Sequence, residues 1–288
     1  MTLTVFLAVL LAAIIHASWN ALVKSTSDKV VAMTAVTIGH APLGLLAMPF
    51  VPFPAPESWK WLALSVFAHT AYQLTLALAY RLGDFTQVYP IARGSAPVII
   101  TIVSVAFLGV TLLPVEYAAI GLICAGIFCL ALLRQTNGLR NPNAVGAALL
   151  TGCFIASYSL LDGTGARAAG TTTASAVGFV AWLTVINAAV FAILIGIINR
   201  PALRGAFTEG RKVMLLGGSG SVMAYVLVVW AMTQAPIPLV TALRETSTIF
   251  ALFIGMLFLK EGLTAGKLFA TILAASGVLL LRFGPSIF

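Results

Sequence analysis

Residues 86–97, TQVYPIARGSAP, and residues 238–248, PLVTALRETST, decide how this chain is built, because each places an arginine inside a long apolar run. A shift of 151 residues sets Arg93 on Arg244. A charged side chain at the centre of a bilayer costs about 2.5–3.5 kcal/mol on insertion scales. Two arginines at matching positions therefore indicate a unit that occurs twice and keeps a polar interior.

Two further stretches support the repeat. The 151-residue shift also sets 125–130 (AGIFCL) on 276–281 (SGVLLL), and a shift of 139 sets 17–24 (ASWNALVK) on 156–163 (ASYSLLDG). The halves are 1–137 and 138–288. Each holds an odd number of apolar runs, five, so the second half enters a membrane in the opposite direction from the first. Inverted repeats of this kind are typical of secondary transporters, which bind their substrate between the repeats near the midplane.

The composition excludes a water-soluble globule. Of the 288 residues 60% are hydrophobic and only 8% are charged, whereas soluble domains carry about 25% charged residues. A crossing needs roughly 20 apolar residues, and lipid accepts only helices or closed barrels. The sequence thus predicts an all-α integral membrane protein with ten transmembrane helices around a central cavity. The predicted spans are 3–23, 31–51, 59–80, 86–108, 114–133, 143–162, 174–198, 213–233, 237–259 and 264–283.

The net charge of +8 indicates membrane loops and no nucleic-acid partner, because the basic residues lie between the apolar runs. Eleven of the 16 basic residues lie on the side reached after odd-numbered spans and 3 lie on the opposite side. The remaining two, Arg93 and Arg244, lie inside spans. The positive-inside rule then predicts that both termini lie outside the cytoplasm.

Two spans of the first half carry polar stripes. His16, Trp19 and Asn20 stand at i, i+3 and i+4, on one helical face, and so do His69, Tyr72 and Gln73. Such side chains face the protein interior or a watery cavity. A cavity lined by rings, donors and acceptors is one interpretation, and hydrogen bonding between helices is the other. His40, alone in its span, is predicted to be a hydrogen-bonded packing residue. All six stripe residues are candidate substrate-binding residues.

The arginine-bearing spans add four candidates. Tyr89 and Arg93 share a helical face, and Arg244 is followed by Glu245, which we take as the only carboxylate well inside a span. Neighbours on a helix diverge by about 100°, so Arg244 and Glu245 are not expected to pair with each other. Glu245 could pair with Arg93 across the repeat, or an arginine could bind a substrate carboxylate; a structural ion network is the alternative.

Tyr158 completes the set of candidates, because the repeat aligns it with Trp19. Asp162 is placed at a helix end. An arginine beside Glu245 would hold that carboxylate in its charged form. The sequence therefore predicts facilitated diffusion by rocking of the two halves, with proton-coupled antiport as the alternative.

The stretches HASWNALVK (16–24) and LKEGLTAGK (259–267), within two five-helix halves, resemble the EamA-type drug/metabolite transporters. By length and aromatic content the chain is most similar to the YddG-type bacterial amino-acid exporters. The resemblance implies ten helices around a central cavity, the bacterial inner membrane, no ATPase, and export of amino acids or related metabolites.

The function predicted from the sequence is transport of aromatic or large neutral amino acids, or of similar small molecules. A sugar-phosphate carrier would need more cationic groups in its cavity than Arg93 and Arg244. A membrane enzyme would need clustered metal ligands or paired carboxylates, and a channel would need rings of like groups around a pore. We expect no cofactor and no metal, the lipid bilayer and a small-molecule substrate as partners, and function as a monomer.

Overall fold

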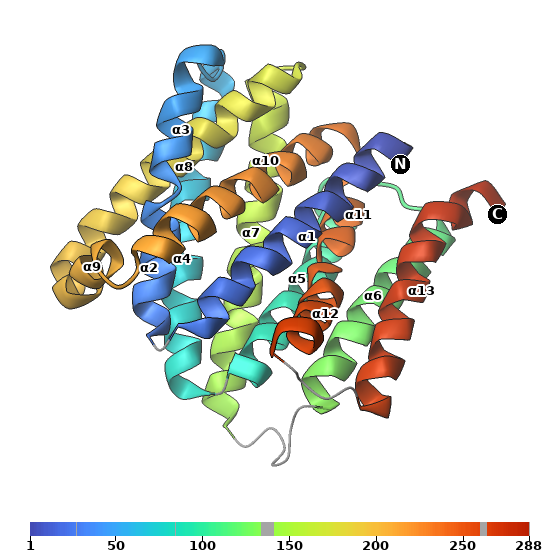
Figure 1. The fold of residues 1–288 in the computed structure, drawn as a ribbon. Coiled ribbons are helices and arrows are strands. Elements are labelled where there is room, and N and C mark those ends of the chain that lie inside the picture. Colours follow the sequence, from blue (N-terminus) through green and yellow to red (C-terminus); the bar gives the residue numbers. More distant parts are fainter. Residues whose placement is uncertain (27, 84, 134–140, 260–263, 288) are drawn as a thin grey trace.

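A computed structural model describes residues 1–26, 28–83, 85–133, 141–259 and 264–287, and this part of the chain is helical with no strands (Figure 1). The helices are α1 (Leu3–Ser25), α2 (Lys29–Ile38), α3 (Ala41–Ala47), α4 (Trp59–Leu82), α5 (Phe85–Phe107), α6 (Pro114–Leu133), α7 (Pro142–Ala169), α8 (Thr173–Ile198), α9 (Arg200–Phe207), α10 (Gly218–Gln234), α11 (Ile237–Arg244), α12 (Ser247–Leu259) and α13 (Ala265–Ile287). A π-helical turn, Val213–Gly217, precedes α10. Residues 260–262 of the LKEG motif lie outside the described residues.

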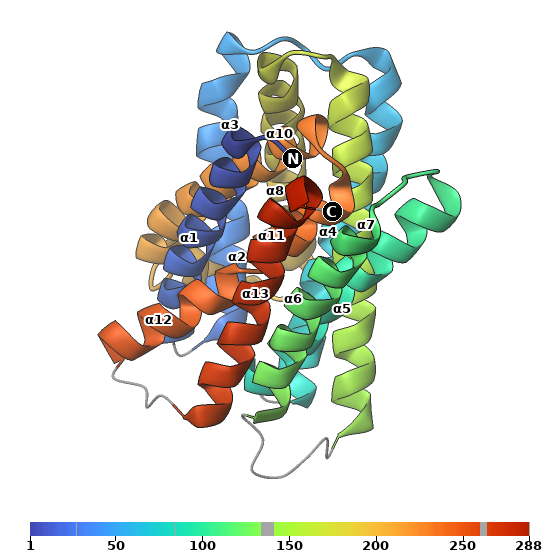
Figure 2. The ribbon, with the colours of Figure 1, turned by 90° about the vertical axis from the view of Figure 1, so that its right-hand side faces the viewer.

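Nine stretches of described residues are long and apolar enough to cross a membrane. They correspond to nine of the ten predicted spans. The remaining predicted span, 114–133, lies in α6. Its described apolar part, Pro114–Leu130, is shorter than the other nine, so its crossing stays a prediction. Figures 1 and 2 place both termini in the same half of the molecule, as an even number of crossings requires. Which side of the membrane that is remains the prediction made from the charges.

The first helix shows how apolar helices are oriented when both of their faces are hydrophobic. Val9 and Ala12 of α1 are fully buried, whereas Leu7 and Leu11 are about half exposed. A helix that is apolar all round suits a membrane protein, whose outer surface faces lipid instead of water. Helix α1 packs against α10 and α12, and its buried face, which includes Val9 and Ala12, belongs to the same apolar cluster as Val228 of α10.

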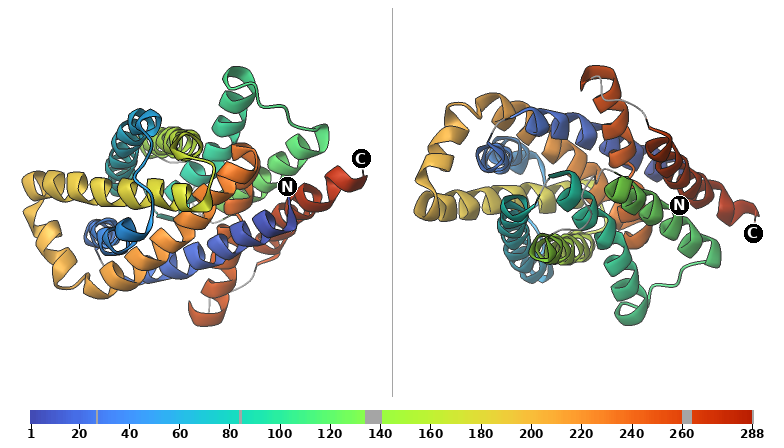
Figure 3. Two further views of the ribbon diagram at one scale, coloured as in Figure 1. Left: turned by 90° about the horizontal axis from the view of Figure 1, so that it is seen from above. Right: turned by 90° about the horizontal axis from the view of Figure 1, so that it is seen from below.

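Helix pairs bring the two predicted halves together. Helix α1 lies beside α10, α4 beside α7, and α6 beside α13 (Figure 3). In the last pair a Cβ added at Gly126 would lie 2.7 Å from the Ala270 oxygen, and one added at Gly277 would lie 2.8 Å from the Ala119 oxygen. These glycines match under the 151-residue shift, and each allows the other helix to approach. The contact supports the repeat, whose inverted arrangement remains a prediction.

The second span is divided at Gly39 and His40, between α2 and α3. A Cβ at Gly39 would lie only 2.0 Å from the Met214 oxygen, and one at Gly218 would lie 2.6 Å from the Gly39 Cα. The glycines thus let two backbones touch, as small residues do at helix interfaces in membranes. Close packing against α2 is therefore what the glycine at the start of α10 provides.

The ninth predicted span, 237–259, is not one helix, because α11 ends at Arg244 and α12 begins at Ser247. Hydroxyl groups compete for backbone acceptors at this break: Thr246 Oγ1 donates to the Leu243 oxygen (2.7 Å) and Thr248 Oγ1 to the Glu245 oxygen (2.8 Å). Its partner in the repeat, α5, remains one helix although it contains Pro90 and Pro97.

Candidate functional site

A cavity of about 140 Å³ lies among eight helices from both predicted halves. This volume is several times the about 10–15 Å³ that a cavity needs to hold one water molecule, so there is room for several waters or for a small molecule. The parts of the wall come from α1, α2, α4, α5, α7, α8, α10 and α11. Its lining is mostly apolar and aromatic with a few polar groups, the usual character of a small-molecule site.

Ten of the eleven predicted site residues line this cavity. They are His16, Trp19, Asn20, His69, Tyr72, Gln73, Tyr89, Arg93, Tyr158 and Arg244. The two polar stripes and the two arginines thus meet around one space. Glu245 is fully buried and is not part of the lining. It contacts both arginines and lies behind them as seen from the cavity. Its direct contact with a substrate, expected from the sequence, stays a prediction.

One end of the cavity, which we call the arginine pole, consists of Arg93, Arg244 and Glu245. The Nε of Arg93 donates to Glu245 Oε2 at 2.7 Å, as one of the sequence-based alternatives expected. Arg244 Nη2 lies 3.6 Å from Glu245 Oε1. The expectation that Arg244 and Glu245 do not pair was therefore wrong. The backbone of Glu245 is still helical (φ −67°, ψ −12°), so the pairing depends on the reach of the two long side chains, which the roughly 100° spacing of their Cα–Cβ bonds leaves out of account.

The arginine pole carries an excess positive charge. Two guanidinium groups and one carboxylate leave one positive charge, and the exposed fractions of Arg93 and Arg244 are only 5% and 4%. Among the described residues, Arg93 Nη2 and the Nε and Nη2 of Arg244 have no hydrogen-bond partner. Buried charges require partners. Because both arginines line the cavity, their charge can attract an anion inside it, and guanidinium groups bind carboxylates with paired hydrogen bonds.

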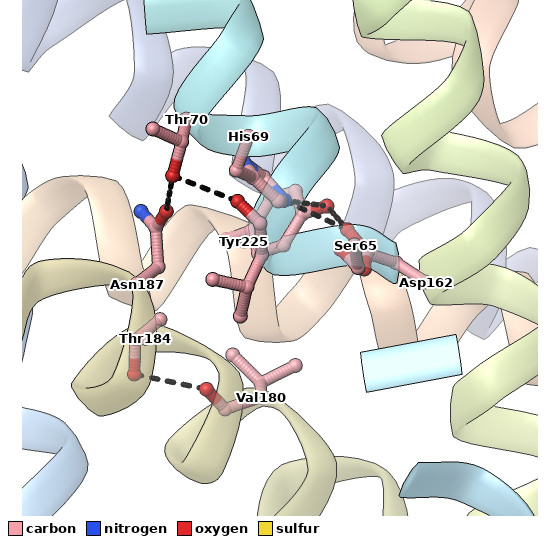
Figure 4. A network of polar contacts seen from close by, with 9 residues as sticks. Ser65, His69, Thr70, Asp162, Val180, Thr184, Asn187 and Tyr225 are labelled. Atoms are coloured by element: carbon pink, nitrogen blue, oxygen red, sulfur yellow. Dashed lines mark hydrogen bonds and ion pairs between the residues drawn. The ribbon is translucent and has the colours of Figure 1, made fainter. Parts of the chain in front are cut away.

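The second buried carboxylate, Asp162, was missed by the sequence analysis, which placed it at a helix end. Helix α7 continues seven residues further, to Ala169, and Asp162 is fully buried. Its carboxylate accepts hydrogen bonds from Ser65 Oγ, from Tyr225 OH, and from His69 Nε2 at 2.9 Å (Figure 4). We call these four residues the aspartate cluster. Glu245 is therefore not the only carboxylate deep inside a span.

Glycines in α7 bring Asp162 within reach of α4. A Cβ at Gly165 would lie 2.6 Å from the Phe179 ring and 2.8 Å from the Trp61 Cβ, so only glycine allows α7 to approach both neighbours this closely. Ser65 and His69 stand at i and i+4 of α4, as Tyr158 and Asp162 do on α7. This matched spacing, together with the small residues that follow Asp162, is the signal in the sequence that could have revealed the cluster.

Aromatic rings lie along the cavity wall between the arginine pole and the aspartate cluster. The rings of His69 and Tyr158 are stacked with centroids 4.1 Å apart, and Tyr72 meets Tyr158 edge to face at 5.4 Å. The guanidinium carbon of Arg93 lies 5.9 Å from the centre of the Tyr89 ring, within cation–π range. Tyr158, predicted from its alignment with Trp19, is therefore the ring against which His69 rests.

The polar groups of the stripes differ in how they are satisfied. Asn20 Nδ2 donates to the His16 backbone oxygen in its own helix (2.9 Å), so this bond does not join two helices. Gln73 Nε2 donates across to Thr37 Oγ1 at 3.0 Å, as in the alternative interpretation. His40 Nε2 lies 3.1 Å from Ser221 Oγ, which confirms that it is a hydrogen-bonded histidine. The buried Trp19 Nε1 has no partner among the described residues.

A third polar group, also missed from the sequence, lies on α8. Asn187 is buried, lines the cavity, and accepts a weak hydrogen bond from Thr70 Oγ1 at 3.4 Å (Figure 4). Thr184 lies one turn earlier, and its hydroxyl donates to the Val180 backbone oxygen. The long apolar run of 174–198 hides these two residues, because they are isolated polar positions in an otherwise hydrophobic helix.

Three comparisons place this geometry among known proteins. The sequence model of the EamA-like transporter family matches residues 3–132 and 143–283. No curated protein matches. A solved structure described only as "Crystal structure of protein" shares the fold, with a TM-score of 0.76 and 19% sequence identity over 97% of this chain and 98% of that chain.

Proposed function

The chain belongs to the EamA-like transporter family of the drug/metabolite transporter superfamily, and from this membership we propose that it transports small metabolites that carry a carboxylate group. Transport would occur by alternating access, with the cavity exposed first to one side of the membrane and then to the other. Membership in a transporter family also favours transport over enzymatic activity.

The excess positive charge of the arginine pole is the observation that carries this proposal. One carboxylate in the cavity would balance the charge of Arg93, Arg244 and Glu245, and a guanidinium group that lines the cavity can bind a carboxylate with paired hydrogen bonds. A phosphate dianion would exceed the single positive charge available. A sugar phosphate is for this reason the weaker candidate.

Within this class, we propose amino acids with aromatic or large neutral side chains. The rings of Tyr72, Tyr89 and Tyr158 and the apolar residues of the lining offer contacts to such a side chain. Export across the bacterial inner membrane, which the resemblance to YddG-type exporters implies, belongs to the same proposal. The sequence-based argument for facilitated diffusion assumed that Glu245 was the only deep carboxylate. Asp162 is a second deep carboxylate, so that reason for facilitated diffusion no longer holds.

The test is counterflow in liposomes that contain the purified protein. Liposomes loaded with one unlabelled amino acid are diluted into the same labelled compound, and uptake is measured for a panel of amino acids. We expect labelled L-phenylalanine to enter the liposomes. Arg244→Gln should lower the rate at least tenfold, since it removes the net positive charge, which amounts to about 1.4 kcal/mol or more.

The matched control is Arg204→Gln, because Arg204 is exposed on α9 and does not line the cavity. This variant should exchange L-phenylalanine like the wild type. Equal rates for Arg244→Gln and the wild type at equal protein content would contradict a carboxylate site at the arginine pole.

A further inference from the structure

The aspartate cluster joins three helices beside the cavity, and the proposed transport step does not use it. Ser65 and His69 come from α4, Asp162 from α7 and Tyr225 from α10. Asp162 is surrounded by donors, whereas His69 and Tyr225 line the cavity and separate it from the carboxylate (Figure 4). The cluster is therefore a buried negative charge covered by a histidine that cavity water can reach.

The hydrogen bonds determine which nitrogen of His69 carries a hydrogen. An ionised carboxylate only accepts hydrogen bonds, so Nε2, at 2.9 Å from Asp162 Oδ2, is the donor. In neutral His69 the other nitrogen, Nδ1, then has a free lone pair. Among the described residues none forms a hydrogen bond to Nδ1, and the His69 side chain is 15% exposed.

The charges of the cluster favour a bound cation. With neutral His69 the cluster carries one negative charge, and no described arginine or lysine is among its hydrogen-bond partners. A proton on Nδ1 would make the histidine positive and neutralise the cluster. The titratable and charged groups around His69, apart from Asp162, are Tyr72 on its own helix, Tyr158 on α7, Tyr225 on α10, His40 between α2 and α3, and the cavity-lining His16, Tyr89, Arg93 and Arg244.

From this arrangement we propose that His69 and Asp162 form a proton-binding site at which a proton and the ammonium group of the substrate exclude each other. A substrate ammonium near His69 donates a hydrogen bond to the Nδ1 lone pair and rests on the faces of the nearby tyrosine rings. A proton on Nδ1 occupies that same lone pair and repels the ammonium. Each group thus leaves when the other binds, and no covalent bond changes except the N–H bond of the imidazole.

This inference rests on the proposed function, because it assumes that the carboxylate of an amino acid binds at the arginine pole. The arginine pole then holds the carboxylate of one zwitterion, and the aspartate cluster holds its ammonium group. Competition at His69 means that one proton crosses the membrane in the direction opposite to each substrate molecule. The protein is therefore a proton-amino acid exchanger, in place of the facilitator expected from the sequence.

The experiment uses liposomes containing the full-length protein, with equal potassium on both sides and valinomycin to hold the membrane potential at zero. Labelled L-phenylalanine is offered outside, with the lumen either more acidic or more alkaline than the exterior. Exchange predicts accumulation in the acidic lumen only, up to about tenfold per pH unit for one proton per substrate. Counterflow without a pH gradient is measured on the same preparation.

Two variants locate the site. His69→Gln retains an N–H donor for Asp162 but cannot take up a proton, and Asp162→Asn removes the negative charge. For each, we expect the ratio of gradient-driven accumulation to counterflow to fall to the level without a gradient, and counterflow in His69→Gln to become independent of pH. In His40→Gln, the control in a neighbouring histidine, gradient-driven accumulation should persist. A role in packing alone would lower both activities together and leave this ratio unchanged.

The outcomes separate the two proposals. Counterflow without gradient-driven accumulation in the wild type overturns the proton site and leaves the transport function standing. Accumulation in an alkaline lumen overturns it as well, because proton and substrate would then move together. Absence of counterflow for the whole amino-acid panel overturns the proposed substrate class and, with it, this inference.

Discussion

The described part of the chain contains two fully buried carboxylates that are satisfied in opposite ways. Glu245 is held by cations, the 2.7 Å bond from Arg93 and the nearby Arg244, and its surroundings keep an excess positive charge. Asp162 is held by a serine, a tyrosine and a histidine, and its surroundings keep a negative charge. The arginine pole therefore favours an anion and the aspartate cluster a cation, although an acidic residue lies at the centre of each.

The difference shows that the partners of a buried carboxylate decide its function more than its burial does. Glu245 cannot lose its charge without leaving two arginines without a counter-ion, so it fixes the arginines in place. Asp162 is covered by His69, the proposed proton-binding group, and by Tyr225. Variants at the two poles should therefore differ in size of effect as well as in kind.

The largest effect is expected from Arg93→Met, which removes the partner of Glu245. Removing one member of a buried ion pair destabilises a protein by about 3–5 kcal/mol. We expect a large drop in the thermal unfolding temperature in detergent. The double variant Arg93→Met with Glu245→Leu should recover only part of that loss, since no unpaired carboxylate remains but the buried Arg244 then lacks its counter-ion. An unchanged unfolding temperature for Arg93→Met would show that Glu245 does not need this partner.

A smaller effect is expected at the other pole from Tyr225→Phe. The variant removes one of three donors to Asp162 while the bonds from Ser65 and His69 remain. A hydrogen bond to a charged group contributes about 1.5–3 kcal/mol. The measurement is again thermal unfolding. A loss as large as that of Arg93→Met would remove the distinction drawn here between the two carboxylates.

Gly165→Ala tests whether close packing of α7 supports the aspartate cluster. The added methyl group would overlap the Phe179 ring and the Trp61 Cβ, and overpacking usually costs about 1–3 kcal/mol. We expect lower thermal stability and weaker coupling between the pH gradient and transport. Gly146→Ala is the control on the same helix, because a Cβ there meets nothing within 4 Å. It should be neutral or slightly stabilising, since alanine favours helix more than glycine does.

The smallest effect is expected for Thr37→Val, which breaks the neutral hydrogen bond from Gln73. Neutral hydrogen bonds contribute about 0.5–1.5 kcal/mol. We expect a small decrease in the unfolding temperature and little change in the pH dependence of transport. A decrease that exceeds the one for Tyr225→Phe would mean that charge does not dominate the energetics of the cavity.

The sequence by itself determined the features that repeat locally along the chain. Apolar runs set the helices, and the spacing of His16, Trp19 and Asn20 set a common face, because a helix places such positions together wherever it lies. The matched arginines, Arg93 and Arg244, indicated that two distant helices share an interior, and both line the cavity. These predictions rest on helix geometry and on the cost of charge in lipid, which require no knowledge of neighbours.

Only the tertiary structure decided which side chains meet across helices. The packing of α5 against α11 brought Arg93 to Glu245, and the close contact at Gly165 brought Asp162 to His69. Both depend on how several helices pack in three dimensions. An apolar run in the sequence does not say which of its residues will face which neighbouring helix. A carboxylate at position 162 can end a helix or hold a proton site, and its three donors from two other helices are what distinguish these roles.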